Sequence, residues 1–537
     1  MTIEVVMQDI AVYDCTLRDG SQGEGIVFSA EDRLLIAQKL DEMGFDYIEG
    51  GFPGAAKKDA DFFVRAQELD LKHAKLAAFT STRRPKQTPE RSPGLKAAIE
   101  SGAPVATIFG KSSLLHVEKV LNTTPSENLR MIEDSCRFAR EHDLEAVYDA
   151  EHFFDGFKLD PEYTLKTLEA AANGGAEVLV LCDTNGGSLP WEIGEIVAEV
   201  AERFDLPLGI HTHNDAGLAV ACSLTAVKHG CSHVQGTVNG YGERCGNANL
   251  CTIIANLELK MARRTIGKRK LTKLRDLSRY VSEMANLPHP KNLPYVGESA
   301  FAHKGGMHID GVRKEPSTFE HVPPERVGNA RRLLISELAG RSSMLDRLSK
   351  YRTELKKDSP EVKQLIKELV DLENSGYQYE GAEASFDLLI RKAFGLRQEL
   401  FHRCGFRIMS ERREDGSILS EATIKVRLGE REVHTAAEGK GPVSAIDNAL
   451  RKALMEFHPE IENISLVDYK VRVIESTSGT GSDVRVLIES TDGRERWGTV
   501  GVSHNIIEAS YIALLDAIEY GLLLSKQTEA HKKQART

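Results

Sequence analysis

Residues 176–182 have the sequence AEVLVLC, a continuous apolar run that is followed by Asp183 and Thr184. A strand with one buried face alternates apolar and polar residues, whereas a parallel strand covered on both faces is apolar throughout. The run therefore predicts a strand of a parallel sheet in the core of an α/β fold, and the polar residues after it predict where that strand ends.

Similar short segments recur along residues 10–260, with helical stretches such as 30–43 and 161–173 between most of them. The predicted strands are 12–15, 47–50, 76–80, 105–109, 146–150, 178–182, 208–212 and 233–238. Strands that alternate with helices in this way predict a (β/α)8 TIM barrel, with a doubly wound sheet as the alternative. No GxGxxG motif follows the first segment, which disfavours a dinucleotide-binding doubly wound sheet.

The pattern changes after the barrel. We predict a TIM-barrel catalytic domain at 1–270, helical linker subdomains at 271–403, a C-terminal α+β domain at 404–525 and a disordered tail at 526–537. The C-terminal part contains an internal duplication, in which Ala445, Ala449 and Ala453 recur as Ala509, Ala513 and Ala517. Each copy shows two strands and an Ala-rich helix, so the duplication predicts a pseudo-symmetric regulatory or dimerising domain.

Composition excludes several classes of protein. The net charge of −11 argues against nucleic acid as a partner, because neutralising phosphates requires clustered Lys and Arg. No apolar run approaches the roughly 20 residues of a membrane span, so no membrane association is expected. The N-terminus shows no signal sequence, and the eight cysteines form no CxxC pair. We therefore expect a cytoplasmic protein with reduced thiols.

Polar motifs follow the predicted strands, and catalytic residues of TIM barrels lie at the C-terminal ends of strands. These motifs lie at 17–20, 49–51, 151–152, 183–185, 211–215 and 239–247. His211 and His213 point to the same face because they are two residues apart on a strand. With Asp19 from the first strand end, they predict a metal site of two imidazoles and one carboxylate, and Asn247 is a further ligand or a neighbour of the metal.

Other side chains at these strand ends suggest how a substrate is held. Arg18, beside Asp19, is the best candidate to polarise a carbonyl group, because a guanidinium stabilises developing negative charge. Glu151 could orient Arg18 or transfer a proton. Thr184 could hold a carboxylate through its hydroxyl group, and the glycine-rich loop at 239–249 would let backbone N–H groups approach an anionic or thioester ligand.

Three ordered motifs give the chain a recognisable family resemblance. LRDGSQ at 17–22, HTHND at 211–215 and GERCGNAN at 242–249 resemble the acyltransferases that include 2-isopropylmalate, homocitrate and citramalate synthases. The resemblance covers almost the whole chain, including the duplicated C-terminal part. In finer detail, the sequence of 13–55 together with AEHFFDG and FAHKGGMHIDGV is most similar to the citramalate synthase branch, which condenses acetyl-CoA with pyruvate and supplies isoleucine biosynthesis. The alternative is 2-isopropylmalate synthase, which uses 2-oxoisovalerate.

The resemblance implies a role for each motif residue. Asp19, His211, His213 and Asn247 would bind a divalent metal (Mg²⁺, Mn²⁺ or Zn²⁺), Arg18 would polarise the keto group, Thr184 would hold the carboxylate, and Glu151 would take part in catalysis or acetyl-CoA activation. His308, in GGMHIDG, resembles a histidine that related enzymes present to the active site of a partner subunit. Relatives often have a tyrosine in this region that could assist proton transfer. The nearby residue of this chain is Phe319, so the resemblance implies no such role for it.

Two further expectations concern specificity and regulation. Phe79 and Phe109, at the ends of the third and fourth strands, would fill the space that a branched acceptor needs, although core packing explains them equally well. The resemblance also implies a homodimer and feedback inhibition by isoleucine through residues 404–525.

Overall fold

The computed structural model describes residues 9–333, 360–379, 381–397, 400–474 and 482–534. They form two compact units, which are described separately: residues 1–302 with 320–332, and residues 303–319 with 333–537. Among the described residues, no helix combines the length and the apolar character that crossing a membrane requires.

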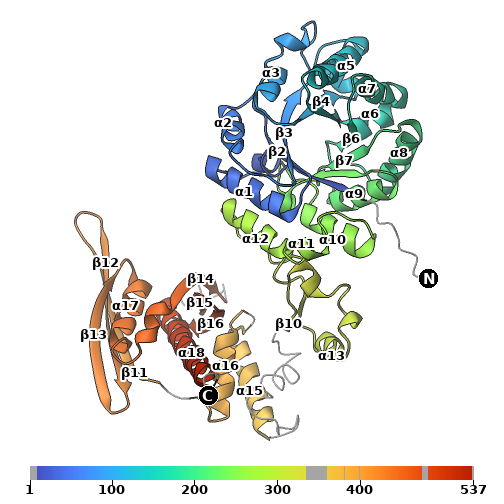
Figure 1. Ribbon diagram of the computed structural model, residues 1–537. Helices are drawn as coiled ribbons and strands as arrows, with labels where there is room; N and C mark the ends of the chain where they lie inside the picture. The colour runs from blue at the N-terminus through green and yellow to red at the C-terminus, as the bar shows by residue number, and fades with distance from the viewer. Residues whose placement is uncertain (1–8, 334–359, 380, 398–399, 475–481, 535–537) are drawn as a thin grey trace. The chain divides into compact units, whose positions relative to one another are not determined.

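The first unit is a closed barrel of eight parallel strands in sequential order, as the strand–helix alternation predicted. The strands are β1 Ala11–Asp14, β2 Tyr47–Gly51, β3 Lys75–Ser81, β4 Val105–Lys111, β5 Glu145–Glu151, β6 Val178–Asp183, β7 Leu208–Thr212 and β8 His233–Gly236. Their outer faces pack against helices, which form a ring around the labelled strands in Figure 1. These helices are α1 Ala30–Met43, α2 Lys57–Ala66, α3 Pro93–Glu100, α4 Leu114–Lys119, α5 Pro125–Glu141, α6 Phe153–Leu159, α7 Pro161–Asn173, α8 Pro190–Arg203, α9 Ala219–Lys228 and α10 Leu250–Lys260.

Local sequence signals set several helix ends. The Ser29 side chain accepts a hydrogen bond from the Asp32 N–H, and Asp32 accepts one from the Ser29 N–H, so a capping box starts α1. Gly44 ends the same helix in the left-handed conformation, with φ of 81°, which glycine adopts without steric cost. At the last strand the prediction was wrong by two residues. β8 ends at Gly236 because Val238–Gly240 form a 3-10 turn in which Asn239 has a φ of 63°.

The barrel interior holds a second, smaller core. Tyr13, Ala77, Val105, Val147 and Val180 are buried there together with other inward-facing side chains of the strands. Inward-facing residues fill the barrel rather than leaving a pore, so a ligand site is confined to the C-terminal ends of the strands.

Helices and two short strands follow the barrel. They are α11 Lys268–Leu271, α12 Leu274–Met284, β9 Ala302–His303, α13 Gly306–Lys314, β10 Arg332–Leu333, α15 Pro360–Asn374 and α16 Glu383–Ala393. β9 and β10 form a two-stranded sheet.

The C-terminal part consists of two similar repeats, each a three-stranded antiparallel sheet covered by one helix. The first comprises β11 His402–Arg412, β12 Ile418–Leu428, β13 Arg431–Gly439 and α17 Pro442–Leu454; the second comprises β14 Ser465–Val473, β15 Val484–Thr491, β16 Arg496–Ser503 and α18 Ile506–Gln534. All six repeated alanines are buried. The duplication predicted only two strands per copy; β11 and β14, which are largely exposed and precede the two predicted strands, are the third strand of each copy.

Candidate active site

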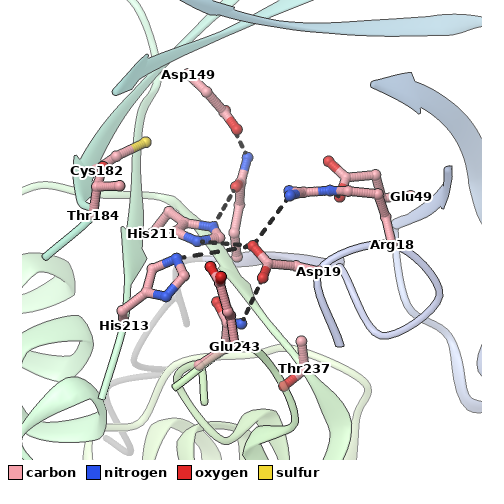
Figure 2. Close-up of polar contacts among 12 residues, drawn as sticks. Arg18, Asp19, Glu49, Asp149, Cys182, Thr184, His211, His213, Thr237 and Glu243 are labelled. Carbon is pink, nitrogen blue, oxygen red and sulfur yellow. Dashed lines mark hydrogen bonds and ion pairs between the residues drawn. The ribbon is translucent and has the colours of Figure 1, made fainter. Parts of the chain in front are cut away.

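The C-terminal ends of the strands bring the predicted metal ligands together. Asp19 follows β1, His211 lies on β7, His213 follows β7, and Asn247 lies in the loop after β8. These elements are neighbours because the closed barrel pairs β8 with both β7 and β1. Figure 2 shows His211, His213 and Arg18 converging on Asp19. All four predicted ligands are buried.

The distances within this cluster suit a single ion. The Nε2 atoms of His211 and His213 lie 3.6 Å and 3.8 Å from Oδ2 of Asp19. The candidate ligand atoms of the three residues all lie within 4.8 Å of one another. Two imidazoles and a carboxylate leave further coordination positions open for a substrate, as a catalytic metal requires.

Asn247 supports the same interpretation through an atom without a partner. Its Nδ2 donates to Oδ1 of Asp19 at 3.1 Å. Its Oδ1 is buried and has no hydrogen-bond partner in the part of the chain that the structure describes. A buried carbonyl oxygen without a partner carries a free-energy cost, and a cation beside Asp19 would satisfy this one.

The electrostatics keep the ligands in their metal-binding protonation states. Burial alone would raise the pKa of Asp19, but the charge of Arg18, the interactions with the two histidines and the Asn247 hydrogen bond outweigh it and lower the pKa to about 2. Burial lowers the pKa of His211 to about 4, with a smaller contribution from His213. Burial also lowers the pKa of His213. The cluster therefore offers one carboxylate and two neutral imidazoles at neutral pH.

Arg18 is held at the edge of this cluster by three contacts. Its Nε donates to Oε2 of Glu49, its Nη1 lies 3.2 Å from Oδ2 of Asp19, and its guanidinium stacks 3.8 Å from the centroid of the Phe79 ring. Glu49 is itself fully buried and accepts a hydrogen bond from the Tyr13 hydroxyl. The guanidinium is therefore fixed in orientation before any substrate binds.

The expectation that Glu151 could orient Arg18 was wrong, because Glu49 does so. Glu49 lies on β2, which is the direct neighbour of β1 in the barrel. Glu151 ends β5 and pairs with Lys111, its register partner on β4, at 2.5 Å. Strand order decides the pairing, because β5 lies four strands away from β1.

A cavity of about 150 Å³ opens beside the cluster. The residues that line it come from the ends of β1, β3, β4, β5, β6 and β7: Arg18, Asp19, Phe79, Phe109, Asp149, Glu151, Cys182, Thr184, His211 and His213. The Oγ1 of Thr184 accepts the His152 backbone N–H at 2.8 Å, which leaves the hydroxyl hydrogen free to donate to a ligand. The cavity thus combines the Arg18 guanidinium, two neutral imidazoles, carboxylates and the Thr184 hydroxyl donor in a space suited to a small molecule.

Glu49 and Asp149 belong to this site, yet sequence reasoning gave neither of them a role. Glu49 stood in a strand-end motif, but its pairing with Arg18 could not be predicted because it depends on β1 and β2 being neighbours in the barrel. Asp149 is two residues before Glu151, so the period-2 rule places both on the inward face of β5 and could have identified it.

His308 lies on α13, where its ring stacks on Phe319 with 4.3 Å between centroids. It belongs to the second compact unit of the chain. Its contribution to the active site of a partner subunit stays a prediction.

Comparisons with known proteins agree with this geometry. Residues 9–281 match the HMGL-like family, 295–376 match the homocitrate synthase post-HMGL domain-like family, and 380–522 match the LeuA allosteric (dimerisation) domain. The chain is 52% identical to the (R)-citramalate synthase of Geobacter sulfurreducens over 98% of this chain and 100% of the relative. It is 52% identical to that of Aquifex aeolicus over 97% and 99%. A probable 2-isopropylmalate synthase of Methanopyrus kandleri is 30% identical over 95% and 97%.

Proposed function

The chain belongs to the (R)-citramalate synthase family of HMGL-like enzymes, and from that premise we propose that it condenses acetyl-CoA with pyruvate. The products are (R)-citramalate and free CoA. The observation that carries the proposal is the convergence of Arg18 with the Asp19, His211 and His213 cluster on one small cavity.

A divalent cation fits the four side chains that converge here. Asp19, His211, His213 and the unpartnered Oδ1 of Asn247 would hold it. When bound, the cation supplies Lewis acidity toward the carboxylate and keto oxygens of the 2-oxo acid. Imidazole and oxygen ligands suit Mg²⁺, Mn²⁺ and Zn²⁺, and cellular availability would select among them.

Arg18 and Thr184 hold the acceptor in this proposal. The Thr184 hydroxyl donates to the pyruvate carboxylate, because its oxygen already accepts the His152 N–H. The Arg18 guanidinium faces the keto oxygen and stabilises the negative charge that develops there. Glu49 and Phe79 keep the guanidinium in place, so no reorganisation is needed as that charge forms.

The reaction makes one carbon–carbon bond and breaks one thioester bond. The acetyl methyl group loses a proton, and its carbon attacks the keto carbon of pyruvate. The keto oxygen becomes an alkoxide beside Arg18 and takes up a proton. Water then cleaves the thioester and releases the CoA thiol and a second carboxylate. Glu151, held by Lys111 at the cavity wall, takes part in the proton transfers or in activating acetyl-CoA.

The small cavity favours pyruvate over a branched acceptor. Phe79 and Phe109 stack with 5.0 Å between their centroids and line the cavity, where an isopropyl group would otherwise fit. Substrate pockets for drug-sized ligands span roughly 300–1,000 Å³, so about 150 Å³ suits a much smaller molecule. The relatives that are 52% identical over nearly the full chain are citramalate synthases, whereas the 2-isopropylmalate synthase is 30% identical.

The C-terminal domain supports regulation and assembly in this proposal. It matches an allosteric dimerisation domain, which supports a homodimer under allosteric control. Isoleucine is the feedback effector in this proposal. All eight cysteines are free thiols, which is consistent with a cytoplasmic enzyme.

The proposal is tested by thiol release from acetyl-CoA. Metal-stripped protein is supplied with Mn²⁺ or Mg²⁺ and offered pyruvate, 2-oxobutyrate, 2-oxoisovalerate and 2-oxoglutarate separately. We expect kcat/KM for pyruvate to exceed that for 2-oxoisovalerate by at least ~100-fold, or roughly 3 kcal/mol. A preference for 2-oxoisovalerate would identify a 2-isopropylmalate synthase instead. An absence of metal-dependent turnover with every acceptor would refute the condensation.

A further inference from the structure

The fully buried side chain of Gln235 connects one histidine of the metal cluster to a buried carboxyl group. Its Oε1 lies 2.9 Å from Nδ1 of His211, and its Nε2 lies 3.0 Å from Oδ1 of Asp149. Figure 2 shows Asp149 and His211 joined in this way through one intervening side chain.

Barrel topology explains why these three side chains meet. His211 and Gln235 each follow directly after the last paired residues of β7 and β8, Ile210 and Val234, so their side chains are neighbours at the same level of the barrel. Asp149 lies on β5, three strands away from β8 in the closed barrel. The Gln235 side chain therefore reaches across the barrel interior to contact it.

The contact to Gln235 decides which nitrogen of His211 carries the proton. A neutral imidazole has one N–H, and the Gln235 carbonyl oxygen can only accept, so the proton lies on Nδ1. Nε2 then has its lone pair free, and this is the atom that faces Oδ2 of Asp19. A proton on Nε2 would instead prevent His211 from binding a metal.

Asp149 decides in turn which way the Gln235 amide points. The Asp149 Oδ1 accepts the amide N–H, and because an ionised carboxylate can only accept, it selects the orientation in which the Gln235 NH₂ group faces it. A reversed amide would direct its NH₂ group at Nδ1 of His211 and would leave the proton on Nε2. Asp149 is only 4% exposed, so water does not replace it as the acceptor.

We infer that Gln235 is a positioning residue that holds the His211 proton on Nδ1, and that Asp149 acts through Gln235 to the same end. The inference rests on the proposed function only in that the cluster binds a divalent metal. It assigns part of the metal affinity to two side chains that are not among the candidate ligands.

Metal binding by the full-length, metal-stripped protein tests the inference without any substrate. Mn²⁺ is titrated in and the free ion is measured by electron paramagnetic resonance. We expect Gln235→Met to weaken Mn²⁺ binding by about 10- to 100-fold. Gln235→Glu keeps an acceptor for the Nδ1–H, so it should bind Mn²⁺ more tightly than Gln235→Met does. Thr164→Val is the matched control, because it removes a different buried hydrogen bond of the barrel unit, to the Ser112 carbonyl, and should leave the affinity unchanged.

A second readout reports the proton itself and needs no variant to fold. Long-range ¹H–¹⁵N spectra of the histidine-labelled, metal-free protein should place the His211 proton on Nδ1. A proton on Nε2 in this wild-type protein would overturn the inference. Equal Mn²⁺ affinities for the wild type and a folded Gln235→Met variant would overturn it as well, as would a Gln235→Glu variant that binds no better than Gln235→Met.

The outcome is separable from that of the proposed function. A protein that binds Mn²⁺ in the expected way but releases no thiol from acetyl-CoA would refute the condensation and leave this inference standing. A wild-type protein that turns over pyruvate without binding Mn²⁺ at this cluster would refute this inference and leave the condensation standing.

Discussion

At the scale of single residues, Arg18 shows how several weak contacts fix one charged group. Lysine keeps the positive charge but has one nitrogen, so Arg18→Lys cannot contact Glu49 and Asp19 in the same geometry or stack on Phe79. We expect Arg18→Lys to lower kcat by about 100- to 1,000-fold in the thiol-release assay. The control Arg65→Lys, at an exposed ion pair with Glu31, should leave kcat unchanged. A loss of less than 10-fold for Arg18→Lys would contradict the role of the guanidinium.

His233 gives a pH dependence of stability at the same scale. Burial lowers its pKa from 6.5 to about 4 in the folded protein. Between these pH values the unfolded chain binds a proton that the folded protein does not, so its contribution to stability is intact above pH 6.5 and decreases as the pH falls toward 4. Relative to His233→Gln, the wild-type free energy of unfolding should fall by up to about 1.4 kcal/mol per pH unit in this window. Urea unfolding of both proteins at several pH values measures the difference, and a constant difference would contradict the expected pKa.

At the scale of elements, strand periodicity and strand order differ in how well a sequence reveals them. The eight strands and the convergence of Asp19, His211 and His213 follow from the apolar runs and from polar residues two apart at strand ends. Two contacts depend instead on strand order. Arg18 bonds Glu49 on the neighbouring strand, and Gln235 bonds Asp149 across the barrel interior, so neither contact follows from the pattern within one strand. β11 and β14 were not predicted; both are largely exposed and precede the first strand that was recognised in each copy, although β14 alternates apolar and charged residues from Val467 to Val473.

The ends of β3 and β4 set the size of the acceptor site. Truncating Phe109 removes one of the two stacked rings that line the cavity. We expect Phe109→Ala to raise the ratio of kcat/KM for 2-oxoisovalerate to that for pyruvate by at least about 10-fold, the lower end of what one methylene contributes in an apolar pocket. Phe138→Leu, in the buried face of α5 outside this cavity, is the control for general destabilisation. An unchanged ratio in Phe109→Ala would show that this ring serves core packing alone.

The Ala-rich face of α18 lets that helix pack closely against β15 and β16. Ala513 is fully buried, and its carbonyl oxygen accepts the Thr499 hydroxyl. Ala513→Leu should destabilise the C-terminal unit by about 1–3 kcal/mol through overpacking. In calorimetry the melting temperature of the C-terminal unit should fall, whereas that of the barrel should stay the same. The barrel transition is identified because added Mn²⁺ raises its melting temperature. Ala436→Leu on the exposed side of β13 should move neither transition.

At the scale of the whole molecule, regulation can be separated from catalysis by truncation. The metal cluster and its cavity lie entirely within the barrel, whereas the allosteric domain match begins at residue 380. We expect isoleucine to inhibit thiol release by the full-length protein and not by a protein that ends after Arg403. The assay uses pyruvate below its KM, with leucine and valine as controls. A full-length protein that ignores all three amino acids would contradict feedback regulation through this domain.

The core shared by the two C-terminal repeats has a consequence for ancestry. Ile424 and Ala449 of the first repeat lie in the same buried cluster as Ile488 and Ala513 of the second. A gene that encoded one repeat would therefore have produced a chain that is stable only as a pair of identical copies. A fusion of two such genes would free each half to diverge, and the two halves do differ: Trp497 is buried in the second repeat, and the corresponding residue of the first is Val433. One half can then change its surface while the other preserves the fold.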